Sequence, residues 1–164
     1  RSFCDNLEIP YYIAKTDISQ IVFDDRKEKS PCSLCAKMRK GALNNLAKSH
    51  GCNKTAFGHH KDDIIDTMLL SLIYEGRFYS FSPVTYLDRI GLTLIRPFMY
   101  VEEADIKGFC RKENVPVLKN TCPVDGETRR QYAKELANSI NRENPGAKDR
   151  MFKAIISGVE SYYR

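Results

Sequence analysis

Short apolar segments alternate with helical patterns along the whole chain, and this alternation is the feature that most restricts the possible folds. The chain has 164 residues, which suffices for one domain with a core. No internal repeat and no long Gly, Ser or Pro linker interrupts the alternation. The pattern is typical of an α/β layer fold with a mostly parallel sheet.

The segments expected to form strands are Tyr11–Ala14, Thr55–Phe57, Leu92–Ile95 and Val115–Leu118. Those expected to form helices are Leu34–His50, Asp62–Tyr74, Glu102–Asn114, Asp125–Asn141 and Lys148–Ser161. Asp24–Lys29 is an expected loop, and Ser80–Asp88 an expected hairpin or loop. Gly51 suits the end of the first helix, and Asn144-Pro145-Gly146 separates the last two. The helix Asp62–Tyr74 is apolar nearly all round, which predicts that it is buried.

Composition excludes several classes of protein. With 42% hydrophobic and 29% charged residues, the chain is not disordered. No apolar run approaches the ~20 residues that a membrane helix needs, and nothing resembles a signal peptide. The 6 cysteines are too few for a disulfide scaffold of this length, so we expect a reduced, cytoplasmic protein.

The positive charge is concentrated in one stretch. The net charge is +5, and the residues outside Cys32–His60 sum to zero. The basic residues within that stretch, which has no acidic one, are Lys37, Arg39, Lys40, Lys48 and Lys54. In the expected helix, Lys37, Lys40, Asn44 and Lys48 share a polar stripe, and Met38, Ala42 and Leu46 an apolar one. A basic patch is typical of a phosphate or nucleic-acid partner, although a solvated helix face is the simpler alternative.

Two cysteines, Cys32 and Cys35, are separated by two residues at the start of the same helix. A helix N-terminus and nearby cations favour thiolates, and this spacing lets both sulfurs bind one metal. The pair fits a zinc half-site, a redox pair or part of an iron–sulfur site, and two unrelated buried cysteines remain an alternative. A redox pair would need a preceding βαβ unit, which the sequence does not indicate.

A third cysteine, Cys122, lies in a polar loop before a proline. Cys110 shares an apolar stripe with Ile106 and Phe109, so core packing explains it. Three candidate ligands without an evident fourth fit structural zinc poorly. They fit better with an iron–sulfur cluster that keeps one iron open.

The segment Gly58-His59-His60-Lys61-Asp62-Asp63 follows an expected strand and opens a helix. Such positions bind anionic ligands in α/β folds. His59 and His60 are candidates for phosphate contact, and Asp62 or Asp63 for Mg²⁺. In the simpler alternative, Asp62 or Asp63 is the N-cap of the helix and the histidines are polar loop residues.

Together these motifs resemble the tRNA 2-thiocytidine biosynthesis (TtcA) family of PP-loop ATPases. The resemblance covers about Ile9 to Ile156. It rests on the order of the cysteine pair, the GHHKDD segment, LIRPF, the lone Cys122 before RRQ, and NPGAKDRMFKAI. Asn144-Pro145-Gly146 is also similar to a motif of related 2-thiouridine enzymes, and the doubled histidine favours the cytidine branch.

The resemblance implies a doubly wound, mostly parallel sheet and ATP-dependent thiolation of a cytidine in the tRNA anticodon loop. It implies adenylation of the base, with Mg²⁺, and sulfide delivery from a [4Fe–4S] cluster held by Cys32, Cys35 and Cys122. By analogy the ATP site includes Gly58, His59, His60, Asp62, Asp63 and Arg96. Charge adds Lys37, Arg39, Lys40, Arg129 and Arg130 as tRNA contacts. A sulfur donor such as a cysteine desulfurase and a homodimer are further expectations.

The chain departs from the family at its N-terminal end. It begins at Arg1 without Met, and the PP-loop motif Ser-Gly-Gly-x-Asp-Ser is absent. We therefore interpret residues 1–164 as a partial PP-loop thiolation domain that lacks its N-terminal strands. Residues 1–31 are then a remnant of the N-terminal half, 32–122 the cluster and nucleotide region, and 123–164 the C-terminal helices. Without those strands, Tyr11–Ala14 has no neighbour to pair with. Alone, such a chain is expected to be inactive toward ATP, and unstable or complemented by another chain.

Three alternatives remain open at this stage. The first is thiolation of a uridine or of another tRNA position. The second is a zinc-stabilised RNA-binding module without catalysis, which the missing PP-loop favours. The third is a protein-interaction domain with incidental cysteines.

Overall fold

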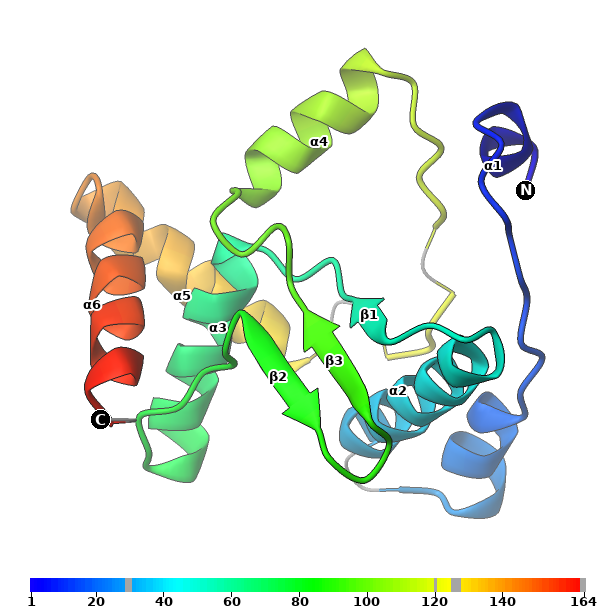
Figure 1. The fold of residues 1–164 in the computed structure, drawn as a ribbon. Coiled ribbons are helices and arrows are strands. Elements are labelled where there is room, and N and C mark those ends of the chain that lie inside the picture. Colours follow the sequence, from blue (N-terminus) through cyan, green and yellow to red (C-terminus); the bar gives the residue numbers. More distant parts are fainter. Residues whose placement is uncertain (29–30, 120, 125–127, 163–164) are drawn as a thin grey trace. The chain divides into compact units, whose positions relative to one another are not determined.

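A computed structural model describes residues 1–28, 31–119, 121–124 and 128–162. The chain divides into two compact units, shown in Figure 1. Unit 1 comprises Arg1–Ala56 and Thr85–Ile95, and unit 2 comprises Phe57–Val84 and Arg96–Arg164. Each unit is described by itself below.

Unit 1 contains a small sheet and the longest helix of the described residues. Its elements are α1 (Ser2–Asn6), the π-helix η1 (Gln20–Asp25), α2 (Pro31–Ser49), β1 (Lys54–Ala56), most of β2 (Val84–Leu87), and β3 (Leu92–Ile95). The strand order is β1-β3-β2, and β1 runs parallel to β3, with Thr55 opposite Leu94. Figure 1 shows β2 and β3 side by side in opposite directions, joined by a turn where Gly91 has a φ of +68°.

The predicted stripes of α2 are partly wrong. Asn44, which we assigned to the polar stripe, is 1% exposed, whereas Leu43 is exposed. The hydroxyl of Thr55 on β1 donates to Oδ1 of Asn44 at 3.3 Å, so the buried amide is hydrogen-bonded to the sheet. Gly51 ends the helix with a φ of +71°, as predicted.

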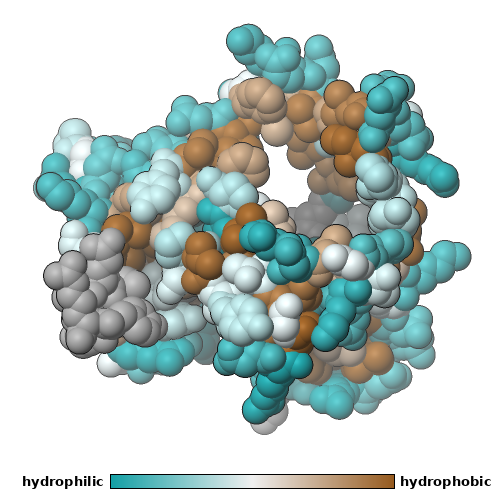
Figure 2. Space-filling model, in the orientation of Figure 1, coloured by the Kyte–Doolittle hydropathy of each residue, from teal (hydrophilic) through white to brown (hydrophobic). Residues whose placement is uncertain are grey.

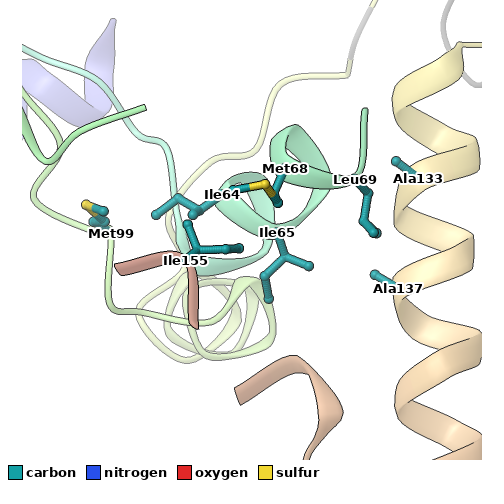
Figure 3. Close-up of a cluster of buried hydrophobic side chains, with 8 residues drawn as sticks. All are labelled: Ile64, Ile65, Met68, Leu69, Met99, Ala133, Ala137 and Ile155. Carbon is teal, nitrogen blue, oxygen red and sulfur yellow. The ribbon is translucent and has the colours of Figure 1, made fainter. Parts of the chain in front are cut away.

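Unit 2 is helical and holds the larger apolar cluster. It comprises α3 (Lys61–Leu70), the π-helix η2 (Ser71–Glu75), α4 (Glu103–Lys112), α5 (Arg129–Glu143) and α6 (Ala147–Tyr162). Ile64, Ile65 and Met68 of α3 lie at the centre of the cluster (Figure 3). Its other members are Leu69, Met99, Ala133, Ala137 and Ile155. The two alanines let α5 approach α3 closely, and removing such buried groups from water is the main stabilising contribution.

Most expected helices are confirmed, with shifted ends. The predicted burial of Asp62–Tyr74 is confirmed for the part that forms α3. It is wrong for Leu72, Ile73 and Tyr74 in η2, which are exposed. The loop predicted for Asp24–Lys29 begins with the last two residues of η1. Gly146 separates α5 from α6 with a φ of +79°. The predicted start of α5 at Asp125 lies outside the described residues, and the helix begins at Arg129.

Two expected strands are wrong. Tyr11–Ala14 and Val115–Leu118 have no regular secondary structure, and their apolar side chains are largely exposed. An extended segment becomes a strand only by pairing, and no described segment pairs with either of them.

The apolar stripe of α4 is not core, contrary to the expectation for Cys110. No residue of α4 is buried, and Phe109 is 61% exposed. Ile106 and Cys110 instead line an open pocket of about 780 Å³ with Val115 and Val117. Figure 2 shows hydrophobic surface beside α4. None of the helices in the described ranges has the length and apolar character needed to cross a membrane.

Candidate functional site

The candidate site is built around the first turn of α3, which His60 caps. His60 has extended backbone, with a φ of −121°. Its Nδ1 accepts from the backbone N–H of Asp63 at 3.4 Å, and Oδ2 of Asp63 accepts from the backbone N–H of His60 at 3.1 Å. This reciprocal pair is a capping box. The N-cap is therefore His60, and not an aspartate as the simpler alternative supposed.

Asp62 is a buried connection between three helices. It is 7% exposed, its Oδ2 accepts from the backbone N–H of Glu103 at 2.8 Å, and its Oδ1 pairs with Nζ of Lys148. Burial raises the pKa of Asp62, but the Glu103 hydrogen bond and the Lys148 ammonium outweigh that effect and leave the pKa below its usual value. The carboxylate therefore fixes the starts of α4 and α6 to α3.

Next to the Asp62–Lys148 pair, the neighbouring residues Lys61 and Asp149 form a second ion pair. Nζ of Lys61 pairs with Asp149 and with Oε1 of Glu102, the latter at 2.9 Å. The dipeptides Lys61-Asp62 and Lys148-Asp149 thus bind each other reciprocally. We refer to these four residues as the Lys-Asp clasp. They line a small pocket of about 230 Å³ with Glu102, Asn141 and Gly146.

Asp63 and Asp66 place further negative charge on α3. Asp63 pairs through Oδ1 with Arg130 of α5 at 3.1 Å. Asp66 is 4% exposed, and burial together with the charges of Asp63 and Asp62 raises its pKa from 3.8 to about 6. Lys134 of α5 pairs with Glu103 at 2.7 Å, and the charges of Glu103, Asp66 and Asp62 help to raise its pKa.

His59 lies in an aromatic stack next to the cap. Its ring centroid is 5.7 Å from that of Phe57 and 4.7 Å from that of Phe81. The guanidinium of Arg96 lies over the same Phe81 ring at 4.7 Å and also binds the carbonyl of Ser82. Burial lowers the pKa of His59 below its usual value; the charge of Asp63 opposes this effect, and the charges of Arg96 and Arg130 add to it.

The stack contains an unsatisfied polar atom. Nδ1 of His59 is buried and has no hydrogen-bond partner among the described residues. Such an atom is uncommon and is often satisfied by a ligand or water. Beside it, a Cβ on Gly58 would meet no described atom within 4 Å, so the space there is open.

The carboxylates of Asp62 and Asp63 have no oxygen left over for magnesium in this arrangement. Both oxygens of Asp62 and both of Asp63 already accept from protein N–H groups or cations. Within the described ranges, no group of three or more His, Cys, Asp or Glu side chains is arranged to hold a metal ion. The assignment of Mg²⁺ to Asp62 or Asp63 therefore stays a prediction.

The three candidate cluster ligands are divided between the units. Cys32 and Cys35 lie three residues apart in the first turn of α2 in unit 1, one exposed and one half-buried. Residues spaced in this way share a helix face. No acidic residue lies in that turn. Cys122 belongs to unit 2 and is half-buried.

The predicted RNA contacts also belong to both units. Lys37 and Arg39 are exposed on α2, Lys40 is half-buried, and none of the three forms an ion pair with a described residue. Arg129 and Arg130 open α5, whose N-cap Thr128 accepts from the backbone N–H of Gln131.

Sequence reasoning missed several residues of the site. Lys148, Asp149 and Glu103 contact the start of α3 from other helices. Lys134 pairs with Glu103, and the ring of Phe81 contacts His59 and Arg96. The repeated Lys-Asp dipeptide was the one available signal. Nothing in the sequence pointed to Phe81, because its contacts depend on how distant segments pack.

Comparison with known proteins identifies the family. A model described as "PP-loop domain" matches residues 1–136. Curated relatives named "tRNA-cytidine(32) 2-sulfurtransferase" include one from Geobacter metallireducens, 38% identical over 88% of this chain and 58% of its own length. Another, from Geotalea uraniireducens, is 40% identical over 92% of this chain and 61% of its own length. The chain thus spans about three-fifths of the length of the curated relatives it matches.

A solved structure shares the fold. It is described as "U34-tRNA thiolase NcsA from Methanococcus maripaludis with its [4Fe-4S] cluster", and it aligns with a TM-score of 0.77 at 20% identity. The alignment covers 97% of this chain and 54% of that chain. The predicted α/β architecture is therefore confirmed. Since the family model covers most of the residues, the chain belongs to the PP-loop domain family.

Proposed function

We propose that this chain is part of an ATP-dependent tRNA sulfurtransferase that replaces the C2 oxygen of an anticodon-loop cytidine with sulfur. The observation that carries the proposal is the pair of thiols one helical turn apart, Cys32 and Cys35, in a chain of the PP-loop family. Relatives that share 38% and 40% of their aligned residues with it carry the name of that activity. Adenylation would convert the C2 oxygen into a leaving group, which departs with AMP.

The start of α3 is the proposed nucleotide site. The open space beside Gly58 and the unsatisfied Nδ1 of His59 support a ligand there. Arg96 supplies a positive charge over the ring of Phe81, which also packs against His59. In this proposal His59 and Arg96 contact the nucleotide, whereas His60, Asp62 and Asp63 hold the helix start in place.

The thiol pair fits two ligands of an iron–sulfur centre. Its helix face, its exposed Cys32 and the absence of a first-turn carboxylate suit thiolate ligation. Cys122 is the proposed third ligand, on the strength of the family resemblance. When bound, a cluster with three cysteine ligands supplies an open iron that holds sulfide for transfer.

The cations of α2 and α5 are the proposed tRNA contacts. Lys37, Arg39 and Lys40 have no ion-pair partner among the described residues, so their charges remain for phosphate. A separate sulfur donor, a homodimer and a cytoplasmic location are parts of the same proposal.

Iron analysis tests the proposal without relying on activity. The natural-length protein is purified anaerobically, and its iron, sulfide and visible spectrum are measured. We expect a brown protein that loses its colour in Cys32→Ala, Cys35→Ala and Cys122→Ala. Cys52→Ala is the matched control, because Cys52 is an exposed thiol of unit 1 outside the pair.

Product analysis then separates the alternatives. Incubation with ATP, sulfide and unmodified tRNA should yield 2-thiocytidine by mass spectrometry of the digested nucleosides. 2-Thiouridine as the sole product would place the enzyme on a uridine instead. A colourless protein that retains zinc and makes no thiolated nucleoside would replace the proposal with an RNA-binding module.

A further inference from the structure

Two exposed tyrosines that follow α3 each lie under the guanidinium of an arginine. The guanidinium of Arg129 lies over the ring of Tyr74 at 4.5 Å, and that of Arg77 lies over the ring of Tyr79 at 4.8 Å. Tyr74 is 43% exposed and Tyr79 is 45% exposed. We refer to these four residues, all in unit 2, as the stacking surface.

Contacts within unit 2 hold the segment that carries this surface. Gly76 has a φ of +62° and ends η2, and the N–H of Arg77 donates back to the carbonyl of Ser71 at 3.3 Å. Nε of Arg77 donates to Glu75 at 2.7 Å, which fixes the plane of the guanidinium over Tyr79. Beyond it, the hydroxyl of Ser80 donates to the buried carbonyl of Ile64 at 3.1 Å.

A close contact fixes the middle of the same segment. A Cβ on Gly158 of α6 would lie 3.0 Å from the ring of Phe78, so this ring packs directly against the helix backbone. One part of the Phe78 ring is thus held against α6, while the side chain is still 44% exposed, as is that of Tyr79 at 45%. A surface held in this way loses little conformational entropy when it binds a partner.

The chemistry of the surface fits unpaired nucleobases. Single-stranded RNA is bound by stacking bases on tyrosine rings and arginine planes, and every base has a face for it. Each ring here carries a guanidinium, which adds positive charge beside an aromatic face. Arg77 is already paired with Glu75, but an apolar protein partner would leave the charge of Arg129 to be desolvated, whereas an RNA partner brings phosphate to it.

We propose that the stacking surface binds splayed-out bases of an RNA loop. The proposal rests on the proposed function, because it names a place where that function's tRNA substrate is held. It adds Tyr74, Arg77 and Tyr79 to the basic residues already assigned to RNA. The surface selects unpaired RNA, since a duplex keeps its bases stacked on each other.

Binding to two RNAs tests the proposal. Fluorescence anisotropy compares a labelled hairpin that has an unpaired loop with a blunt duplex of equal length, using the natural-length protein. We expect preference for the hairpin, and Tyr74→Ala or Tyr79→Ala should each weaken hairpin binding by about five- to a hundredfold. Tyr74→Phe and Tyr79→Phe keep the ring and should bind like the unsubstituted protein. Tyr86→Ala removes a tyrosine that is 62% exposed in unit 1 and is the matched control.

The outcomes separate this proposal from the proposed function. Hairpin binding that Tyr74→Ala and Tyr79→Ala leave unchanged would overturn the stacking surface and leave tRNA thiolation standing. Equal loss in the Phe and Ala variants would also overturn it, because stacking needs only the ring. A shift in oligomeric state on gel filtration, with RNA affinity intact, would assign the surface to a protein contact instead. No binding to either RNA by the unsubstituted protein would contradict the proposed function itself.

Discussion

Asp66 carries a carboxyl group that the fold keeps from water on α3. Burial raises its pKa from 3.8 to about 6, and Asp63 and Asp62 add to the effect. A carboxyl whose pKa is higher in the folded state stabilises the fold at low pH and loses that contribution as the pH rises through the folded value. At pH 7 the ionised Asp66 therefore destabilises the protein.

We expect Asp66→Asn to raise the free energy of unfolding at pH 7 by about 1–3 kcal/mol. The gain should shrink as the pH falls below about 6 and vanish near pH 4, where the carboxyl is protonated in both states. Urea unfolding at several pH values measures it, with exposed Asp105→Asn as the control. A gain that does not depend on pH would contradict the assigned cause.

At the residue scale, the start of α3 was predictable and the partners of its side chains were not. The GHHKDD segment indicated a helix start, and the structure places the cap of α3 there. The sequence could not show that His60, and not an aspartate, is the N-cap, because the choice depends on backbone geometry. Nor could it show that Asn44 is buried, since that depends on the hydroxyl of Thr55 in another element.

At the element scale, the Lys-Asp clasp joins the first turns of α3 and α6. We expect Lys148→Ala to lower the free energy of unfolding by about 2 kcal/mol, because it leaves the buried Asp62 without its cation. Asp149→Ala breaks the other pair of the clasp, but Asp149 is exposed, so we expect no measurable loss. Urea unfolding of both variants gives the comparison. Equal losses would mean that burial of Asp62 does not decide the cost.

Two helical glycines provide a second matched comparison. A Cβ on Gly108 of α4 would meet no described atom within 4 Å, whereas one on Gly158 of α6 would lie 3.0 Å from Phe78. We expect Gly108→Ala to stabilise the protein by about 0.5–1 kcal/mol through helix propensity. Gly158→Ala should gain less, because the ring of Phe78 must move. Thermal unfolding of both variants checks this, and an equal gain would show that the Phe78 contact carries no strain.

The helices were predictable because their signals are local. Apolar periodicity and the breaker at Asn144-Pro145-Gly146 place α5 and α6 within a few residues of their observed ends. Strand formation depends on partners far along the chain. Leu92–Ile95 has such a partner in β1, but Tyr11–Ala14 and Val115–Leu118 pair with none of the described segments. The sequence indicated that both segments are extended, but it does not show whether a partner strand is present for either of them.

At the scale of the whole molecule, the proposed activity needs residues from both units. The cysteine pair and the basic face belong to unit 1, and the nucleotide residues, Cys122 and the stacking surface belong to unit 2. Each of these groups lies wholly within one unit. The order of the motifs in the sequence was therefore a better guide to the family than any single motif, because it combines residues that lie in different units.

Electrostatics give a prediction for the whole molecule. The net charge of +5 equals the excess of one stretch, and Lys37, Arg39 and Lys40 of α2 lie in it without an ion-pair partner in the described ranges. Each phosphate contact releases condensed counterions, so RNA affinity falls with salt in proportion to the number of contacts. Replacing the three residues with glutamine should lower the slope of log affinity against log salt by about 2.

Anisotropy titrations with a labelled tRNA at several salt concentrations measure this slope. Lys15→Gln, an exposed cation of unit 1 outside α2, is the matched control and should leave the slope unchanged. The alanine variants of the stacking surface should weaken binding at every salt concentration and keep the slope, because base stacking releases few ions. The two sets of variants thus separate phosphate contact from base contact. If the glutamine variants leave the slope intact, the basic face of α2 is only a solvated helix surface.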